Sequence, residues 1–150
     1  MNNPNTARDA GIRCEQLKAY FESLSRESVL NLGDFYASNV WFKDPFNEVN
    51  TLNEVRDIFL KMFDQVGEPR FVIGDMINQG DQLFMTWDFL FSIKGINKGK
   101  TMTCRGSSHL KFDANDKVVY HRDYWDTSEE LYEKIPLVGG FMRWLKSRAA

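Results

Sequence analysis

The sequence has few cysteines, no long apolar run and no excess of one charge. Cys14 and Cys104 are too few for a disulfide framework, and this usage is typical of a reducing cytoplasm. No window approaches the roughly 18 apolar residues of a membrane span, and the polar N-terminus lacks a signal-peptide core. The 19 Lys and Arg against 21 Asp and Glu leave no basic surplus for nucleic acid. We therefore expect a soluble cytoplasmic protein without a membrane or nucleic-acid partner.

Apolar and aromatic residues, in contrast, are plentiful. They make up 43% and 14% of the 150 residues, and this content excludes an intrinsically disordered chain. A chain of this length can bury about two-thirds of its unfolded surface, which is enough for a core of its own. No repeat or Pro/Gly/Ser-rich linker divides it, so we expect one domain.

The order of the expected elements is helices first and strands later. Apolar residues recur at helical spacing in residues 7–23 and 27–36, and a capping box of Thr51 and Glu54 opens a third helix. Segments with strand character, separated by turns, lie at residues 40–46, 82–93, 100–112 and 117–126. Short helical pieces are expected at residues 127–132 and 141–145. This order predicts an α+β protein with its helices on one side of a three- or four-stranded antiparallel sheet.

The strand at residues 82–93 has two different faces. Its odd-numbered positions from Leu83 to Ile93 are all apolar, whereas the even-numbered positions are mixed. Alternation alone places the odd face in the core and the even face in water. Phe84 and Leu90 on the even face favour partial cover by a partner subunit, so a symmetric dimer is plausible.

Asp44 is the most interesting carboxylate. It is in phase with the apolar Val40, Phe42 and Phe46 and directly precedes Pro45. A carboxylate on a buried face has a raised pKa, which suits proton transfer. The alternative is a turn aspartate that caps nearby backbone amides. Both interpretations stay open from the sequence.

A second candidate lies in the strand at residues 117–126. His121 and Asp123 project from the same face and could form an acid/base pair or a solvated polar ladder. Trp125 on that face favours an enclosed, partly apolar pocket. With two histidines, His109 and His121, on differently patterned strands and no metal-binding spacing, we expect no metal site. The chain also lacks a glycine-rich phosphate loop, so we expect no cofactor.

Four stretches together carry a family resemblance. They are residues 20–24 (Tyr-Phe-Glu-Ser-Leu), residues 40–46 with the capped helix after them, residues 108–112 and residues 117–125. The chain resembles the nuclear transport factor 2-like superfamily, in its bacterial branch of ketosteroid-isomerase-like and polyketide-cyclase-like (SnoaL-like) proteins. The resemblance implies a domain at residues 1–126, with residues 127–150 as a C-terminal helical extension of that domain.

This family's fold is a cone, in which three N-terminal helices pack into a curved antiparallel sheet and leave a deep pocket. The outer sheet face commonly forms a homodimer. By this resemblance the even face of residues 82–93 turns inward, the reverse of the face that alternation places in the core. The implied pocket for a small apolar ligand is lined by Phe42, Phe84, Thr86, Asp88 and Trp125.

The resemblance also implies catalytic residues. Asp44 matches the proton-shuttling base of ketosteroid isomerases, Tyr20 matches the tyrosine that holds the enolate oxygen, and Ser108 stands in place of a protonated aspartate. The polyketide-cyclase branch has an acid/base aspartate on the last strand, and Asp123 falls near that position. With Asp44 as the base, His121 and Asp123 would be auxiliary acid/base groups. The implied function is a cofactor-independent isomerase or cyclase acting on an apolar carbonyl compound.

Two alternatives remain. The first is a binding module that holds a hydrophobic ligand or a protein partner without chemistry, because a fold does not establish function. The second is epoxide hydrolysis, which needs an arginine between two aspartates. Arg105 and Arg122 fall on faces opposite the candidate carboxylates, and this placement disfavours the second alternative.

Overall fold

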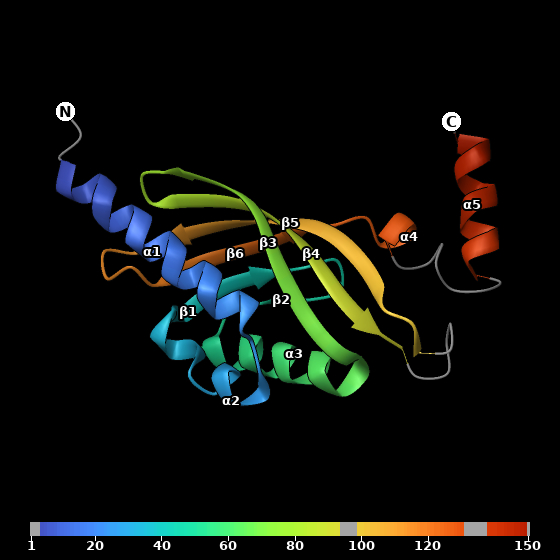
Figure 1. Ribbon diagram of the computed structural model, residues 1–150, viewed down its shortest axis with the longest axis horizontal. Coiled ribbons are helices and arrows are strands. Elements are labelled where there is room, and N and C mark those ends of the chain that lie inside the picture. Colours follow the sequence, from blue (N-terminus) through green and yellow to red (C-terminus); the bar gives the residue numbers. More distant parts are fainter. Residues whose placement is uncertain (1–3, 94–98, 131–137, 150) are drawn as a thin grey trace.

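The computed structural model describes residues 4–93, 99–130 and 138–149. Helices come at both ends of the described chain. They are α1 (Pro4–Glu22), α2 (Arg26–Val29), the 3₁₀ helix η1 (Leu32–Asp34), α3 (Leu52–Gln65), α4 (Thr127–Glu130) and α5 (Val138–Ala149). Figure 1 shows α1, α2 and α3 gathered beside the sheet, whereas α5 stands beyond its far end. None of the described helices is long and apolar enough to cross a membrane.

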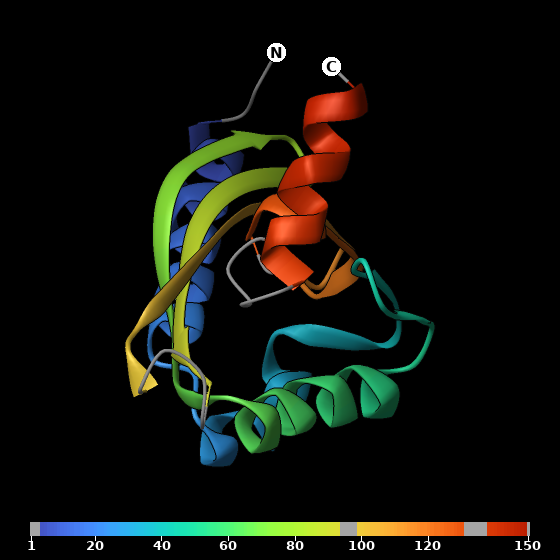
Figure 2. The same ribbon diagram turned by 90° about the vertical axis from the view of Figure 1, so that its right-hand side faces the viewer.

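Six strands form one sheet. They are β1 (Tyr36–Lys43), β2 (Glu48–Val49), β3 (Gly67–Gln79), β4 (Gln82–Ser92), β5 (Met102–Phe112) and β6 (Val118–Tyr124). Their order is β2-β1-β6-β5-β4-β3, and every neighbouring pair is antiparallel except β1 and β6. The sheet curves strongly, with α3 closing its lower side (Figure 2). The α+β class is confirmed, and the sheet is larger than predicted because both β1 and β2 join it, β1 through parallel pairing with β6.

α1 and α3 bury their apolar residues against the concave face of this sheet. Leu17 and Phe21 of α1 and Val55 and Phe59 of α3 belong to one core cluster with the strands. Thr51 caps the start of α3 as expected, since its hydroxyl accepts from the Glu54 amide at 3.3 Å. The Glu54 carboxylate accepts from the Asn50 amide and the Thr51 hydroxyl, so the reciprocal half of the capping box does not form. This arrangement leaves the opposite, convex face of the sheet to solvent.

The single helix predicted at residues 27–36 is two shorter pieces. α2 ends at Val29, η1 follows, and β1 begins at Tyr36. Lys117 Nζ donates to the carbonyls of Gly33 and Asp34 at 2.9 and 2.7 Å. These contacts come from Lys117, which directly precedes β6, and no local pattern in residues 27–36 could indicate them.

The two faces of β4 lie as simple alternation predicts. Leu83, Met85 and Trp87 are buried against the helices, so the inward turn of the even face implied by the family resemblance is wrong. The physical reason lies on β5, where a side chain at Gly106 would overlap the Trp87 ring. Because position 106 has no side chain, the large indole fits on the concave face.

The even residues of β4 accordingly lie on the convex face. Phe84, Thr86 and Asp88 are all exposed there and cannot line a pocket on the concave side. The Thr86 hydroxyl accepts from the Asp75 amide at 2.9 Å, where the register of β3 shifts. The prediction that these three residues line the pocket is therefore wrong, and they belong to the convex face.

Candidate functional site

A chain of hydrogen bonds connects five side chains on the concave face. The Trp87 indole N–H donates to Ser108 Oγ at 2.8 Å, and the Ser108 hydroxyl donates to Asp123 Oδ1 at 2.5 Å. His121 Nε2 lies 2.6 Å from the same Oδ1, and the Tyr36 hydroxyl lies 2.6 Å from His121 Nδ1. Asp123 is thus the point at which two branches meet.

The strand register explains why these residues meet. Ser108 of β5 is the direct partner of Asp123 on β6, and His121 is the partner of Phe42 on β1. His121 and Asp123 are two residues apart and therefore share a face, as the sequence predicts. Four different strands contribute to the chain, so it exists only in the folded sheet.

The positions of the protons follow from this pattern. Asp123 Oδ1 accepts from both Ser108 and His121, so Nε2 of His121 carries hydrogen. If Nδ1 also carried hydrogen, the Tyr36 hydroxyl would have no acceptor in the described part of the chain. We therefore assign Tyr36 as donor to Nδ1 and His121 as the Nε2–H tautomer.

Burial makes the network rigid and leaves one end open. Ser108, His121 and Tyr36 are 1%, 2% and 1% exposed, whereas the Asp123 side chain is 17% exposed. Burial, with a smaller contribution from the Asp123 charge, raises the pKa of Tyr36 well above its usual value, so its hydroxyl remains a donor. Asp123 Oδ2 has no hydrogen-bond partner among the described residues. This oxygen is the accessible acceptor of the network.

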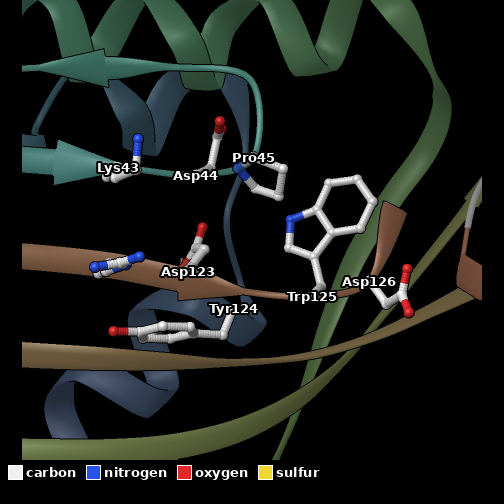
Figure 3. A pocket seen from close by; sticks show the side chains of 8 residues that line it. Lys43, Asp44, Pro45, Asp123, Tyr124, Trp125 and Asp126 are labelled. Carbon is white, nitrogen blue, oxygen red and sulfur yellow. The ribbon is translucent and has the colours of Figure 1, made fainter. Parts of the chain in front are cut away.

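Asp123 opens into a pocket of about 520 Å³. The pocket forms where β1 and β6 end, and its lining is drawn in Figure 3. It is lined by Lys43, Asp44, Pro45, Arg122, Asp123, Tyr124, Trp125 and Asp126. Small-molecule sites commonly have volumes of about 300–1,000 Å³, so a small substrate fits.

Asp44 lines this pocket, but its carboxylate is engaged in its own turn. Oδ1 accepts from the backbone amides of Phe46 and Asn47 at 2.7 and 2.6 Å. The Asn47 side-chain amide also lies 3.0 Å from each carboxylate oxygen. Figure 3 shows the Asp44 carboxylate directed away from Asp123. The capping interpretation describes what Asp44 does in the structure.

Tyr20 and Phe42 lie away from the pocket. The Tyr20 hydroxyl donates to the Ser28 carbonyl at 2.8 Å, and burial raises the pKa of Tyr20 to about 12. Phe42 is fully buried between Phe59 and His121, with ring centroids 6.0 and 4.8 Å away. Aromatic rings thus fill the space around Phe42, and neither residue reaches the pocket near Asp123.

Trp125 is the predicted pocket residue that the structure places in the pocket. Its ring lines the pocket and packs edge to face on Phe46, which is not part of the lining, with the centroids 5.6 Å apart. Phe46 itself is exposed. The site therefore combines one carboxylate oxygen with an aromatic surface.

Sequence reasoning missed Tyr36 and the polar role of Trp87. Tyr36 falls in a segment predicted as helix, so nothing pointed to its pairing with His121. Trp87 was grouped with the apolar core, although its N–H needed an acceptor once buried. That requirement was the signal that could have been used.

The two arginines of the disfavoured epoxide-hydrolysis alternative have other partners, although Arg122 lines the pocket. Arg105 pairs with Glu130 at 2.8 Å, and the Arg122 guanidinium lies 4.7 Å from the ring centre of Tyr124. Neither donates to a carboxylate of the network. Within the described ranges, no cluster of three or more metal-ligating side chains occurs.

Comparison with known proteins gives a family and a fold. The family model of the SnoaL-like domain matches residues 17–121. No curated protein matches the sequence. Among solved structures, a proposed SnoaL-like polyketide cyclase from Shewanella denitrificans is 20% identical, with a TM-score of 0.66, covering 80% of this chain and 96% of that one.

Two further solved structures have the same fold. A protein with a ketosteroid isomerase-like fold from Catenulispora acidiphila, in complex with trimethylamine, is 13% identical with a TM-score of 0.67, covering 79% of this chain and 88% of that one. An LEH-like epoxide hydrolase from M. tuberculosis is 11% identical with a TM-score of 0.66, covering 97% and 96%. At these identities the likeness concerns the fold alone.

Proposed function

We propose that this chain, which belongs to the SnoaL-like family of nuclear transport factor 2-like proteins, catalyses proton transfer on a small apolar carbonyl compound with Asp123 as the base. One observation carries the proposal. Asp123 presents one unpartnered carboxylate oxygen to a pocket while its other oxygen is fixed by Ser108 and His121.

The chemistry is an enolisation followed by reprotonation. Asp123 Oδ2 takes a proton from the carbon next to the carbonyl, and the electron pair of that C–H bond forms the enolate. Reprotonation at another carbon gives an isomer, whereas attack of the enolate carbon on a second carbonyl of the same molecule closes a ring. Oδ1 accepts from its two donors in both protonation states, so the network needs no rearrangement.

The pocket lining supports a partly apolar substrate. Trp125 and Pro45 offer apolar surfaces beside Asp123, and Phe46 packs against the Trp125 ring. Such surfaces orient a ring or alkyl ketone so that its acidic carbon faces the base. The base assignment thus moves from Asp44, which the family resemblance favours, to Asp123 of the last strand.

Deuterium incorporation tests this function without knowledge of the natural substrate. The protein is incubated in D₂O with a panel of cyclic and aryl ketones, and loss of the α-proton signal is followed by NMR. Wild type is expected to accelerate exchange above buffer for at least one ketone. Asp123→Asn is expected to lower that rate about 100-fold or more, the usual size of a general-base contribution.

Two comparisons make the test specific. Asp57→Asn removes an exposed carboxylate on α3, far from the pocket in sequence and absent from its lining, and should exchange like wild type. Asp44→Asn neutralises the other carboxylate considered as the base, and its exchange rate is compared with that of Asp123→Asn. If Asp44→Asn abolished exchange and Asp123→Asn did not, the proposed base would be wrong.

The alternative function predicts a different pattern. A binding module would hold members of the panel, detected by ligand-observed NMR, with no exchange above buffer in any variant. Asp123→Asn would then change affinity and nothing else. The buried network favours catalysis, because an apolar ligand alone needs no carboxylate held by two donors.

We also propose that two copies associate through the convex sheet face. Val72, Ile77 and Phe84 are 41%, 66% and 40% exposed there, and Ile77 pairs directly with Phe84. Sedimentation velocity should detect a dimer that Ile77→Asp disrupts. Leu30→Asp, at an exposed apolar residue near α2, is the control and should leave the dimer intact.

A further inference from the structure

An enolisation by Asp123 needs a donor for the oxygen that becomes negative. Hydrogen bonds aimed at that oxygen are commonly the largest single contribution to such catalysis. The two donors implied by the family resemblance are engaged elsewhere. Tyr20 donates to the Ser28 carbonyl, and Ser108 donates to Asp123 itself. The donor must therefore come from another residue of the pocket.

Trp125 has a polar group in the right place. It lies two residues after Asp123, on the same face of the chain, and both line the pocket. Figure 3 shows the nitrogen-bearing edge of the indole turned toward Pro45 and Asp123. Among the residues that the structure describes, Trp125 Nε1 has no hydrogen-bond acceptor. A partly buried indole N–H normally has one.

The two cationic residues of the pocket are less suited. Lys43 Nζ pairs with Glu48 Oε2 at 3.1 Å, and this contact lowers the pKa of Glu48. The Arg122 guanidinium lies over Tyr124, whose alternation along β6 is opposite to that of Asp123. Trp125 is therefore the donor that shares a face with the base.

We propose that Trp125 Nε1–H is the oxyanion donor of this site and that the substrate is a planar carbonyl compound lying between it and Asp123. This inference rests on the proposed function. As the C–H proton moves to Asp123 Oδ2, the C–H electron pair becomes the C=C bond and the carbonyl π pair moves to oxygen. The indole N–H donates to that oxygen, and the charge returns when carbon is reprotonated.

The experiment uses 4-nitrophenolate as a probe of the enolate and uncharged 4-nitroanisole as its neutral partner. Asp123→Asn removes the carboxylate that repels an anion and resembles the base after proton transfer. Binding of both probes to this variant and to the double variant Asp123→Asn/Trp125→Phe is measured by calorimetry. Phenylalanine keeps the aromatic wall and removes the N–H.

The expected result is a selective loss. Because a hydrogen bond to a charged group is strong, the double variant should bind 4-nitrophenolate at least about tenfold more weakly. Its affinity for 4-nitroanisole should change less than about threefold, because the wall remains. Asp123→Asn/Trp41→Phe, which changes a tryptophan stacked on Tyr120 away from the pocket, should bind both probes like Asp123→Asn.

Several results would overturn the inference. They are equal losses for both probes, no loss for the phenolate, or no phenolate binding to Asp123→Asn. A second measurement covers a double variant that does not fold. In Asp123→Asn, the indole N–H resonance of Trp125 should move downfield when 4-nitrophenolate is added, and an unmoved resonance contradicts the role.

The two proposals can fail separately. Probe binding needs no turnover. If Trp125→Phe does not weaken phenolate binding, the deuterium-exchange result for Asp123 still stands. Conversely, exchange that survives Asp123→Asn removes the proposed base, whatever the calorimetry shows for Trp125.

Discussion

Asp44 and Asp123 line the same pocket and are held in opposite ways. Asp44 is fixed by groups two and three residues away in its own turn, the amides of Phe46 and Asn47. Asp123 is fixed by Ser108 from the neighbouring strand and by His121, which Tyr36 of a third strand orients. One carboxylate completes a turn, and the other completes a network.

This difference supports a structural role for Asp44 and is the basis of the catalytic role that we propose for Asp123. Both oxygens of Asp44 accept hydrogen bonds within the turn, whereas Asp123 Oδ2 has no partner among the described residues. A residue type on an apolar strand face is thus not enough to identify a base. What decides is whether an oxygen remains after the fold has used the others.

Gly106→Ala is expected to have the largest effect, because it disrupts the hydrogen-bond network that holds Asp123. The added methyl group would overlap the Trp87 ring, so the indole must leave Ser108. We expect a loss of about 3 kcal/mol in the free energy of unfolding, measured in urea. Gly11→Ala meets nothing within 4 Å on α1 and should be neutral or slightly stabilising. Equal effects would contradict the packing argument.

Ser108→Ala removes the bridge between Trp87 and Asp123. The buried indole N–H then has no acceptor, and we expect a loss of about 2 kcal/mol in chemical denaturation. Ser107→Ala, on the same strand with the opposite alternation, is the control and should cost less than about 0.5 kcal/mol. A small effect at Ser108 would mean that the indole finds another partner.

Tyr36→Phe tests the far end of the network through its pH dependence. The raised pKa of Tyr36 keeps it protonated in the folded state, while the unfolded chain loses that proton near pH 10. Its stabilising contribution is complete below pH 10 and falls as pH rises further, by up to about 1.4 kcal/mol per pH unit.

Phenylalanine at position 36 has no hydroxyl to titrate. The free energy of unfolding of Tyr36→Phe should therefore fall less steeply above pH 10 than that of wild type. At neutral pH we expect a loss of about 1 kcal/mol for the hydrogen bond to His121. Parallel curves for the two proteins between pH 10 and 11.5 would show that Tyr36 titrates normally in the folded state.

The smallest expected effect is at Asp44. Asp44→Ala removes the acceptor of two turn amides that stay near water, and we expect a loss of about 1 kcal/mol. Asp44→Asn keeps one acceptor oxygen and should lose about half as much. A larger loss from Asp44→Asn than from Ser108→Ala, both measured by thermal unfolding, would reverse the comparison drawn between the two carboxylates.

Much of the fold could be predicted from the sequence, because its signals are local. The Thr51 cap, the turns between strands and the alternation in β5 placed those elements correctly. The shared face of His121 and Asp123 followed from a spacing of two. The parallel pairing of β1 with β6 could not be predicted, since it depends on residues more than 70 positions apart.

The candidate site was predicted only in part. His121 and Asp123 were predicted as a possible pair, whereas Ser108 was predicted without its contact to Asp123, and the expected base was Asp44 instead of Asp123, the base that we propose. Tyr36 was missed because its place at the start of β1 depends on pairing with β6, and the residues before it have helical spacing. The concave orientation of β4 was assigned wrongly from the resemblance, although alternation alone gave the right face.

By itself the sequence determined which elements form and which side chains share a strand face, because capping, turns and alternation act over a few residues. Only the tertiary structure decided which carboxylate has an oxygen to offer. That outcome depends on donors from several strands, and a hydrogen bond between distant residues has no trace in the spacing of either one.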